Sequence, residues 1–189
     1  MPLTTLDPNT ALIIIDLQKG IVNGDFVHPI TDIIGQTCSL LDAFRAENLP
    51  VVLVNVAGRP RGRTEQGPRS SISFADGWTE LLPELDQQPG DIVITKQSWG
   101  VFATTDMERE LKARGVTQVV VAGVVTSGGV EATARQAYEL GFNVTLPLDA
   151  MTDIREAAHQ NSIRNVFPRL GETGLTQEIL ALLEERMPV

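Results

Sequence analysis

Residues 119–138, VVVAGVVTSGGVEATARQAY, contain the clearest indication of how this chain folds. It begins with four apolar residues, 119–122, of the kind that form a strand covered on both faces. A turn containing Gly123, Gly128 and Gly129 follows, and a helix is expected to begin near Val130. When a parallel strand turns sharply into a helix, backbone N–H groups lie at the carboxyl edge of the sheet, where α/β proteins bind ligands.

Gly128 and Gly129 have no side chain, so a ligand could approach the backbone of this turn closely. A tight turn that needs glycine only for its own conformation would have the same sequence. Two other polar residues end predicted strands in the same way, and this favours a binding role for the turn.

Strands and helices alternate along the rest of the chain. This alternation predicts an α/β fold in which helices cover both faces of a parallel sheet of about six strands. The 189 residues suffice for one core, so we expect a single domain over 1–189. Beside residues 119–122, strands are expected at 11–15, 51–56, 91–95, 142–146 and 170–171, and helices at 30–48, 105–114, 130–140, 157–166 and 176–186.

Asp16 and Lys96 directly follow the predicted strands 11–15 and 91–95, so both belong to the same sheet edge as the 123–129 turn. Burial at a strand end would raise the pKa of Asp16, and a nearby Lys96 ammonium would lower it again. These opposed effects suit a general acid or base. A structural buried ion pair would look the same in sequence, and the spacing alone does not separate the two.

Composition excludes several classes of function. The net charge of −9 argues against non-specific nucleic-acid binding and against binding to an anionic membrane surface. The longest apolar run, 11–15, is too short to span a bilayer, and the N-terminus lacks a signal-peptide pattern, so we expect a cytoplasmic protein. The single cysteine, Cys38, falls on the apolar stripe of helix 30–48 and is predicted to be a buried core residue.

Residues 57–77 are rich in glycine and proline and contain arginines 59, 61, 63 and 69. A loop of this length within a compact domain is a functional lid or a mobile segment. Four arginines in an acidic protein indicate an anionic ligand or a partner surface, and a solvated loop is the alternative.

Several common motifs are incomplete. The glycines of the 123–129 turn lack the lysine and the Ser/Thr of a phosphate-binding P-loop, and no dinucleotide fingerprint follows a strand. Ser127 lies in a turn similar to a nucleophile elbow, but the first glycine is missing and the chain has only His28 and His159 as bases. Two scattered histidines without a carboxylate cluster do not predict a metal site.

Three stretches resemble the isochorismatase-like hydrolase superfamily, also called the cysteine hydrolase family. They are ALIIIDLQKG at 11–20, VITKQSWGVFATTDMERELKARG at 93–115 and VVVAGVVTSGGVEATARQAYELGFNV at 119–144. With the segment around HQNSI, the likeness covers nearly the whole chain. It implies a three-layer α/β/α Rossmann-like fold with a parallel sheet.

The resemblance also implies site residues. The family's usual triad is Asp, Lys and Cys; the first two fall on Asp16 and Lys96, whereas the cysteine position holds Gly129. A non-proline cis peptide is expected between Val124 and Val125, where it would aim backbone N–H groups at the substrate. Val125, Gly128 and Gly129 are therefore expected to bind substrate.

The reaction that the resemblance implies depends on the missing cysteine. Cysteine members hydrolyse amides through a thiolate, which this turn lacks. Isochorismatases proper also have glycine there and cleave a vinyl ether, with the Asp protonating the vinyl carbon. Their glutamine after the second strand corresponds to about Gly58, which argues against isochorismate itself. Nicotinamidases bind a metal through histidines after that strand; residues 55–58 contain none, so neither a metal nor a cofactor is expected.

We therefore predict a hydrolase that acts on a small anionic metabolite, with Asp16 as acid and base and Lys96 as its partner. A catalytically silent binding or scaffold protein is the alternative, and an amidase using Cys38 would require that residue to leave its helix stripe. A closed polar pocket holding Asp16 and Lys96 would favour the enzyme, and a filled pocket the scaffold. The family also implies a homo-oligomer, a dimer or a tetramer. Its interface or the pocket could be covered by Trp78, Trp99 and Phe102.

Overall fold

One parallel sheet forms the centre of the protein in the computed structural model, which describes residues 3–60, 62–65 and 74–186. The strands follow the spatial order β3-β2-β1-β4-β5-β7, and the short β6 pairs with β4. All pairs between these strands are parallel. The strands are β1 (Thr10–Ile15), β2 (Val51–Val56), β3 (Ile92–Lys96), β4 (Gln118–Val124), β5 (Asn143–Pro147), β6 (Met151–Thr152) and β7 (Glu172–Gly174).

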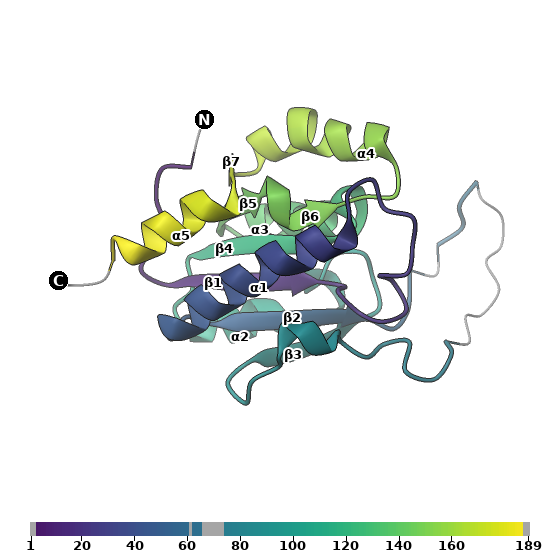
Figure 1. Ribbon diagram of the computed structural model, residues 1–189, viewed down its shortest axis with the longest axis horizontal. Coiled ribbons are helices and arrows are strands. Elements are labelled where there is room, and N and C mark those ends of the chain that lie inside the picture. The colour runs from purple at the N-terminus through teal and green to yellow at the C-terminus, as the bar shows by residue number, and fades with distance from the viewer. Residues whose placement is uncertain (1–2, 61, 66–73, 187–189) are drawn as a thin grey trace.

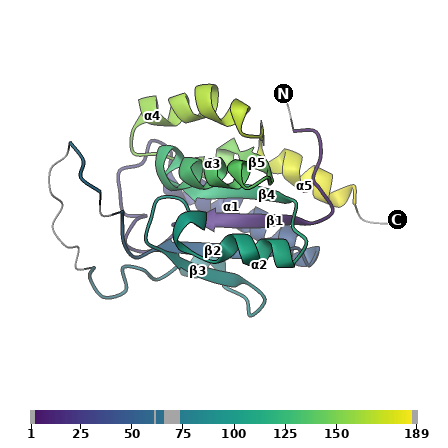
Figure 2. The same ribbon diagram turned by 180° about the vertical axis from the view of Figure 1, so that it is seen from behind.

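Helices cover both faces of the sheet, so the predicted three-layer α/β/α architecture is confirmed. Figure 1 looks onto the face covered by α1 (Ile30–Ala46) and α5 (Thr176–Glu184). The view from behind shows α2 (Met107–Ala113) and α3 (Glu131–Glu139) on the opposite face (Figure 2). A further helix, α4 (Glu156–Asn161), follows β6. None of the helices that the structure describes is long and apolar enough to cross a membrane.

The central strand β1 is buried at every residue because both of its faces are covered. Ile13 and Ile15 pack in the core beneath α2 and α3, whereas Leu12 and Ile14 pack in the core beneath α1 and α5. This explains why the strand is a continuous apolar run rather than an alternating one.

The observed elements differ from the predicted ones at short strands and at helix ends, because these depend on contacts between distant parts of the chain. The last strand was expected at 170–171, but β7 begins at Glu172, and the two-residue β6 was not predicted. The helix expected over 157–166 divides into α4 and a π-helical turn, Ser162–Val166. Another π-helical turn, Thr126–Val130, precedes α3.

Cys38 is half-buried, so its prediction as a buried core residue is wrong. The buried side of α1 is narrower than the apolar stripe in the sequence, and it consists of Ile33, Thr37, Leu40, Leu41 and Phe44. Cys38 lies at the border of that side, where its Sγ is 3.2 Å from the carbonyl oxygen of Glu84.

Candidate active site

Asp16 follows the last residue of β1, at the carboxyl end of the strand. Its N–H still donates to the Val54 carbonyl at 2.9 Å, but its φ of 55° turns the chain out of the strand. Aspartate is one of the few residues that accept this left-handed conformation. The Gln18 N–H closes the turn on the Asp16 carbonyl at 2.9 Å. This turn places the carboxylate at the carboxyl edge of the sheet.

Lys96 ends β3, two strands away from β1, on the same face of the strand as Ile92 and Ile94. Neighbouring strands lie about 4.8 Å apart, so a side chain must cross roughly 10 Å to reach β1, and the long lysine stem makes this contact feasible. The Nζ atom lies 2.7 Å from Asp16 Oδ2 and 3.2 Å from the carbonyl oxygen of Ser98. The lysine side chain is only 1% exposed.

Burial dominates the electrostatics of this ion pair. Desolvation raises the pKa of Asp16 from its ordinary value of 3.8 to about 6, although the charge and hydrogen bond of Lys96 both act to lower it. Lys96 holds Oδ2, while Oδ1 is buried and has no hydrogen-bond partner among the described residues. A carboxyl group with one anchored oxygen, one available oxygen and a pKa near neutrality is suited to proton transfer.

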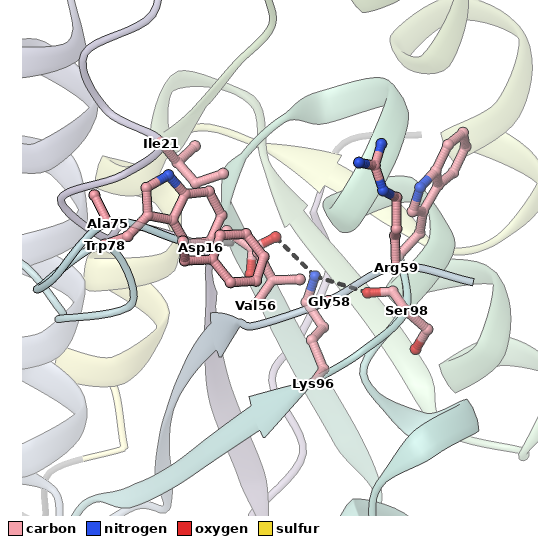
Figure 3. Close-up of a pocket in the computed structure, with 11 residues that line it drawn as sticks. Asp16, Ile21, Val56, Gly58, Arg59, Ala75, Trp78, Lys96 and Ser98 are labelled. Atoms are coloured by element: carbon pink, nitrogen blue, oxygen red, sulfur yellow. Dashed lines mark hydrogen bonds and ion pairs between the residues drawn. The ribbon is translucent and has the colours of Figure 1, made fainter. Parts of the chain in front are cut away.

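The ion pair lies at one side of a pocket of about 320 Å³. In Figure 3, Trp78 and Ile21 lie on the Asp16 side of the pair, and Arg59 lies toward Ser98. The pocket is not filled by side chains. Its walls are more apolar than predicted, because the aromatic side chains of Phe74 and Trp78, from the segment after β2, contribute to them. The described lining residues are Asp16, Ile21, Val56, Gly58, Arg59, Phe74, Ala75, Trp78, Lys96, Ser98 and Trp99.

The aromatic wall is fixed by residues immediately after Asp16. The fully buried Gln18 amide accepts from the Val56 N–H at 2.7 Å and donates to the carbonyls of Val56 and Trp78, each at 3.1 Å. The Trp78 indole lies against Gly20, where a β-carbon would come within 2.1 Å of the ring. The indole also stacks on Phe74, with ring centroids 4.2 Å apart. One buried amide thus joins two walls of the pocket to the strand that carries Asp16.

Comparison with known proteins gives this site a context. The family model of the isochorismatase domain matches residues 10–178, most of the chain. The chain belongs to the isochorismatase family. An uncharacterized isochorismatase family protein of Bacillus subtilis, YwoC, is 37% identical over 178 residues, which cover 90% of this chain and 92% of the relative. YecD of Escherichia coli O157:H7, also described as uncharacterized, is 34% identical over 180 residues, 92% of this chain and 96% of the relative.

A solved structure has the same architecture. The isochorismatase family protein from Burkholderia thailandensis superposes with a TM-score of 0.90 at 37% identity, covering 95% of this chain and 98% of that structure. Members of the family are hydrolases, amidohydrolases and a nicotinamidase among them, and this chain is an isochorismatase-family hydrolase.

The turn after β4 lies beside Asp16 in this isochorismatase-family protein. The peptide bond between Val124 and Val125 is cis, where the resemblance implies one. Gly129 borders Asp16, since a β-carbon at position 129 would lie 3.1 Å from Oδ2. The N–H of Gly128 donates to the Val125 carbonyl at 3.0 Å, within the turn. Val125, Gly128 and Gly129 are not among the described lining residues, and substrate contact by them stays a prediction.

Side chains from the β6–α4 region hold this turn in place. Asp153, 1% exposed, accepts the Ser127 N–H on Oδ2 at 2.7 Å. His159 Nδ1 lies 2.8 Å from Thr126 Oγ1, and its ring packs 4.9 Å from that of His28. Burial first, and the His28 charge next, lower the pKa of His159. A serine triad would require a histidine paired with Ser127, but His159 is paired with Thr126 instead.

Some of the aromatic residues and arginines that were expected near the site line the pocket, and others do not. Trp78 and Trp99 line the pocket, but Phe102 is buried and stacks on Phe142 with centroids 5.8 Å apart. Of the four arginines in 57–77, Arg59 lines the pocket, and residues 61 and 69 lie outside the described part of the chain. Within the described ranges, no group of three or more His, Cys, Asp or Glu residues could hold a metal ion.

Proposed function

We propose that this isochorismatase-family protein hydrolyses a small anionic vinyl ether, with Asp16 as general acid and base and Lys96 as its electrostatic partner. The observation that carries the proposal is Asp16 Oδ1, a buried carboxylate oxygen without a partner in the described structure. Buried polar atoms are nearly always hydrogen-bonded, so an unpaired one beside a pocket indicates a ligand that completes it.

The chemistry follows from the proton that Asp16 can hold. A pKa of about 6 leaves a usable fraction of the group protonated near neutral pH. In the proposed reaction, Oδ1 gives this proton to the terminal carbon of the vinyl group, and the ether-bearing carbon becomes a cation stabilised by its oxygen. Water adds to that carbon and returns a proton to Asp16. The resulting hemiketal then collapses to an alcohol and a ketone.

Lys96 has two roles in this scheme. Its bond to Oδ2 at 2.7 Å leaves Oδ1 as the oxygen that exchanges the proton. Its charge also keeps the pKa of Asp16 from rising further, so that the carboxylate can take a proton back from water. An ammonium with three N–H donors and two acceptors in the described structure retains one donor for the substrate.

The charges around the pocket support an anionic substrate. Arg59 and Lys96 contribute two cations against the single carboxylate of Asp16. A guanidinium can bind a carboxylate through two parallel hydrogen bonds, which fixes the orientation of the molecule as well as its charge. The apolar wall formed by Trp78, Ile21 and Val56 would contact the uncharged part of the same molecule.

The absence of a cysteine at position 129 favours vinyl-ether over amide cleavage in this proposal. Amide hydrolysis in the cysteine members that the chain resembles requires a thiolate nucleophile. Protonation of carbon followed by addition of water requires only an acid and a water molecule. A catalytically silent scaffold is disfavoured by the unfilled pocket, because a scaffold has no need to keep a cavity open beside an unpaired carboxylate oxygen.

A substrate screen with paired variants tests the proposal. The purified protein is assayed against carboxylated vinyl ethers, amides and esters, and each hit is repeated with Asp16→Asn. We expect turnover of vinyl ethers that Asp16→Asn removes. For the anion contact, Arg59→Gln should raise KM, whereas Arg63→Gln, an exposed arginine of the same segment that is absent from the described lining, should not. Turnover of amides alone would contradict the proposal.

A further inference from the structure

The loop after Lys96 contains a chain of hydrogen bonds between hydroxyl groups. The Ser98 Oγ donates to the Gly100 carbonyl at 2.7 Å and lies 2.9 Å from Thr104 Oγ1. A carbonyl cannot donate, so the single hydroxyl proton of Ser98 is used in the first of these bonds, and Thr104 is the donor in the second. Thr104 Oγ1 in turn accepts the Gln97 N–H at 3.4 Å. The chain of donors therefore runs in one direction, from the Gln97 N–H to the Gly100 carbonyl.

The backbone that this chain folds is the backbone that holds Lys96. The Lys96 Nζ donates to the Ser98 carbonyl oxygen at 3.2 Å and to Asp16 Oδ2 at 2.7 Å, and these are its two acceptors in the described part of the chain. Because the lysine side chain is only 1% exposed, water cannot readily replace an acceptor that turns away. The orientation of one carbonyl group thus helps to fix where the ammonium lies relative to Asp16.

Helix α3 anchors the other half of the same loop. Gln136 Oε1 accepts the Phe102 N–H at 2.9 Å. Gly100 lies so close to Gln136 that a β-carbon there would come within 2.4 Å of its Oε1. Within residues 97–99, by contrast, the described hydrogen bonds are those of the hydroxyl chain and the one from Lys96. The hydroxyl chain is therefore what ties this first half of the loop to the anchored second half.

We infer that Ser98 is a positioning residue, whose hydroxyl fixes the carbonyl oxygen that holds the Lys96 ammonium against Asp16. Thr104 supports this hydroxyl from the surface: it is exposed, lies in the 3-10 helical turn Phe102–Thr104, and is absent from the described lining of the pocket. This inference deepens the proposed function and rests on it for the use that is made of the Asp16 proton. The contacts themselves can be tested without any substrate.

Loss of either hydroxyl should raise the pKa of Asp16. Lys96 lowers this pKa through its charge and its hydrogen bond, and Lys96 and Arg59 are the other charged groups of the described lining. When the Ser98 carbonyl turns away, the ammonium loses one of its two acceptors, so it is held less closely and lowers the pKa less. The carboxyl signal of Asp16, identified by its absence in Asp16→Asn, is followed by ¹³C NMR as pH is varied. We expect a midpoint near pH 6 in the parent, and a midpoint roughly 1 pH unit higher in Ser98→Ala and in Thr104→Val.

Three comparisons separate this role from a general loss of stability. Thr104→Ser keeps the hydroxyl and should restore the parent midpoint. Thr105→Val makes the same change in the next residue, whose hydroxyl donates to the Val101 carbonyl outside the chain. It should lower stability in urea and leave the midpoint unchanged. The double variant Ser98→Ala/Thr104→Val should shift the midpoint no further than Ser98→Ala alone, because both hydroxyls act through one chain.

The same Asp16 midpoint in the parent, Ser98→Ala and Thr104→Val would overturn the inference. An equal shift in Thr105→Val, or additive shifts in the double variant, would overturn it as well. Because Thr104 is exposed, its two variants decide the question even if Ser98→Ala does not fold. The titration uses no substrate, so a failed vinyl-ether screen would leave these results unchanged, and the two failures can be told apart.

Discussion

Replacing Lys96 by methionine is expected to make the stability of the protein depend on pH above pH 6. Methionine retains much of the apolar stem but removes the partner of Asp16 Oδ2 in the described structure. The side chain of Asp16, 9% exposed, would then have no hydrogen-bond partner for either carboxylate oxygen among the described residues. Since the charge and hydrogen bond of Lys96 both lower the pKa of Asp16, their loss should raise it well above its present value of about 6.

The magnitude follows from linkage between protonation and folding. In the unfolded chain Asp16 releases its proton near pH 3.8, and in the folded protein near pH 6. Between these values the folded state holds a proton that the unfolded state has lost, so stability falls as pH rises, by roughly 3 kcal/mol in total. Above pH 6 this loss stops growing in the parent. In Lys96→Met it should continue at about 1.4 kcal/mol per pH unit.

Urea unfolding at pH 6, 7 and 8 measures this difference directly. The parent and Lys96→Met should diverge steadily, by up to roughly 2.7 kcal/mol over the two pH units. The double variant Asp16→Asn/Lys96→Met is the control, because it has no carboxyl group at position 16 and should lose this extra slope. Parallel stability curves for the parent and Lys96→Met from pH 6 to 8 would show that Lys96 does not hold down the pKa of Asp16.

Four further predictions concern activity and assembly. Asp16→Asn should lower hydrolysis by about 10²–10⁴-fold, the usual contribution of a general acid or base, and a smaller loss in steady-state kinetics would move the chemistry elsewhere. Iodoacetamide and Cys38→Ala should both leave activity intact, because burial raises the pKa of the thiol and Cys38 is absent from the described lining; rapid inactivation would contradict this. Gln18→Glu should raise KM more at pH 8 than at pH 5.5, because a carboxylate would face the carbonyls of Val56 and Trp78; a KM independent of pH would show that the amide does not position the wall. Light scattering should give a homo-oligomer rather than a monomer of 20.5 kDa.

Much of the sheet edge could be predicted because it depends on local sequence. A continuous apolar run can be accommodated only where both faces are covered, so 11–15 had to be an inner strand and Asp16 had to follow it. The same reasoning applies to Lys96. Parallel strands end at one edge, and this brings the two residues together without any knowledge of the loops.

Other parts of the site depend on contacts between distant segments. Gln18 binds Val56 and Trp78, 38 and 60 residues away, and nothing in its immediate sequence indicates a buried amide. Gly20 is the one indication in the sequence, because a glycine shortly after a strand can mark a place where another group packs closely against the backbone. Here that group is the Trp78 indole. The half-burial of Cys38 could not be predicted because it depends on how α1 is rotated against the sheet and on the carbonyl of Glu84.

Deuterium transfer tests the central proposal, proton delivery from Asp16 to carbon, most directly. A carboxylated vinyl ether that the protein turns over is hydrolysed in D₂O, and the ketone product is analysed by NMR and mass spectrometry. Asp16 exchanges its proton with solvent, so we expect one deuterium on the carbon that was the vinyl terminus, and loss of this product with Asp16→Asn. Enzyme-dependent hydrolysis that leaves that carbon without deuterium, or that persists in Asp16→Asn, would show that Asp16 does not deliver the proton.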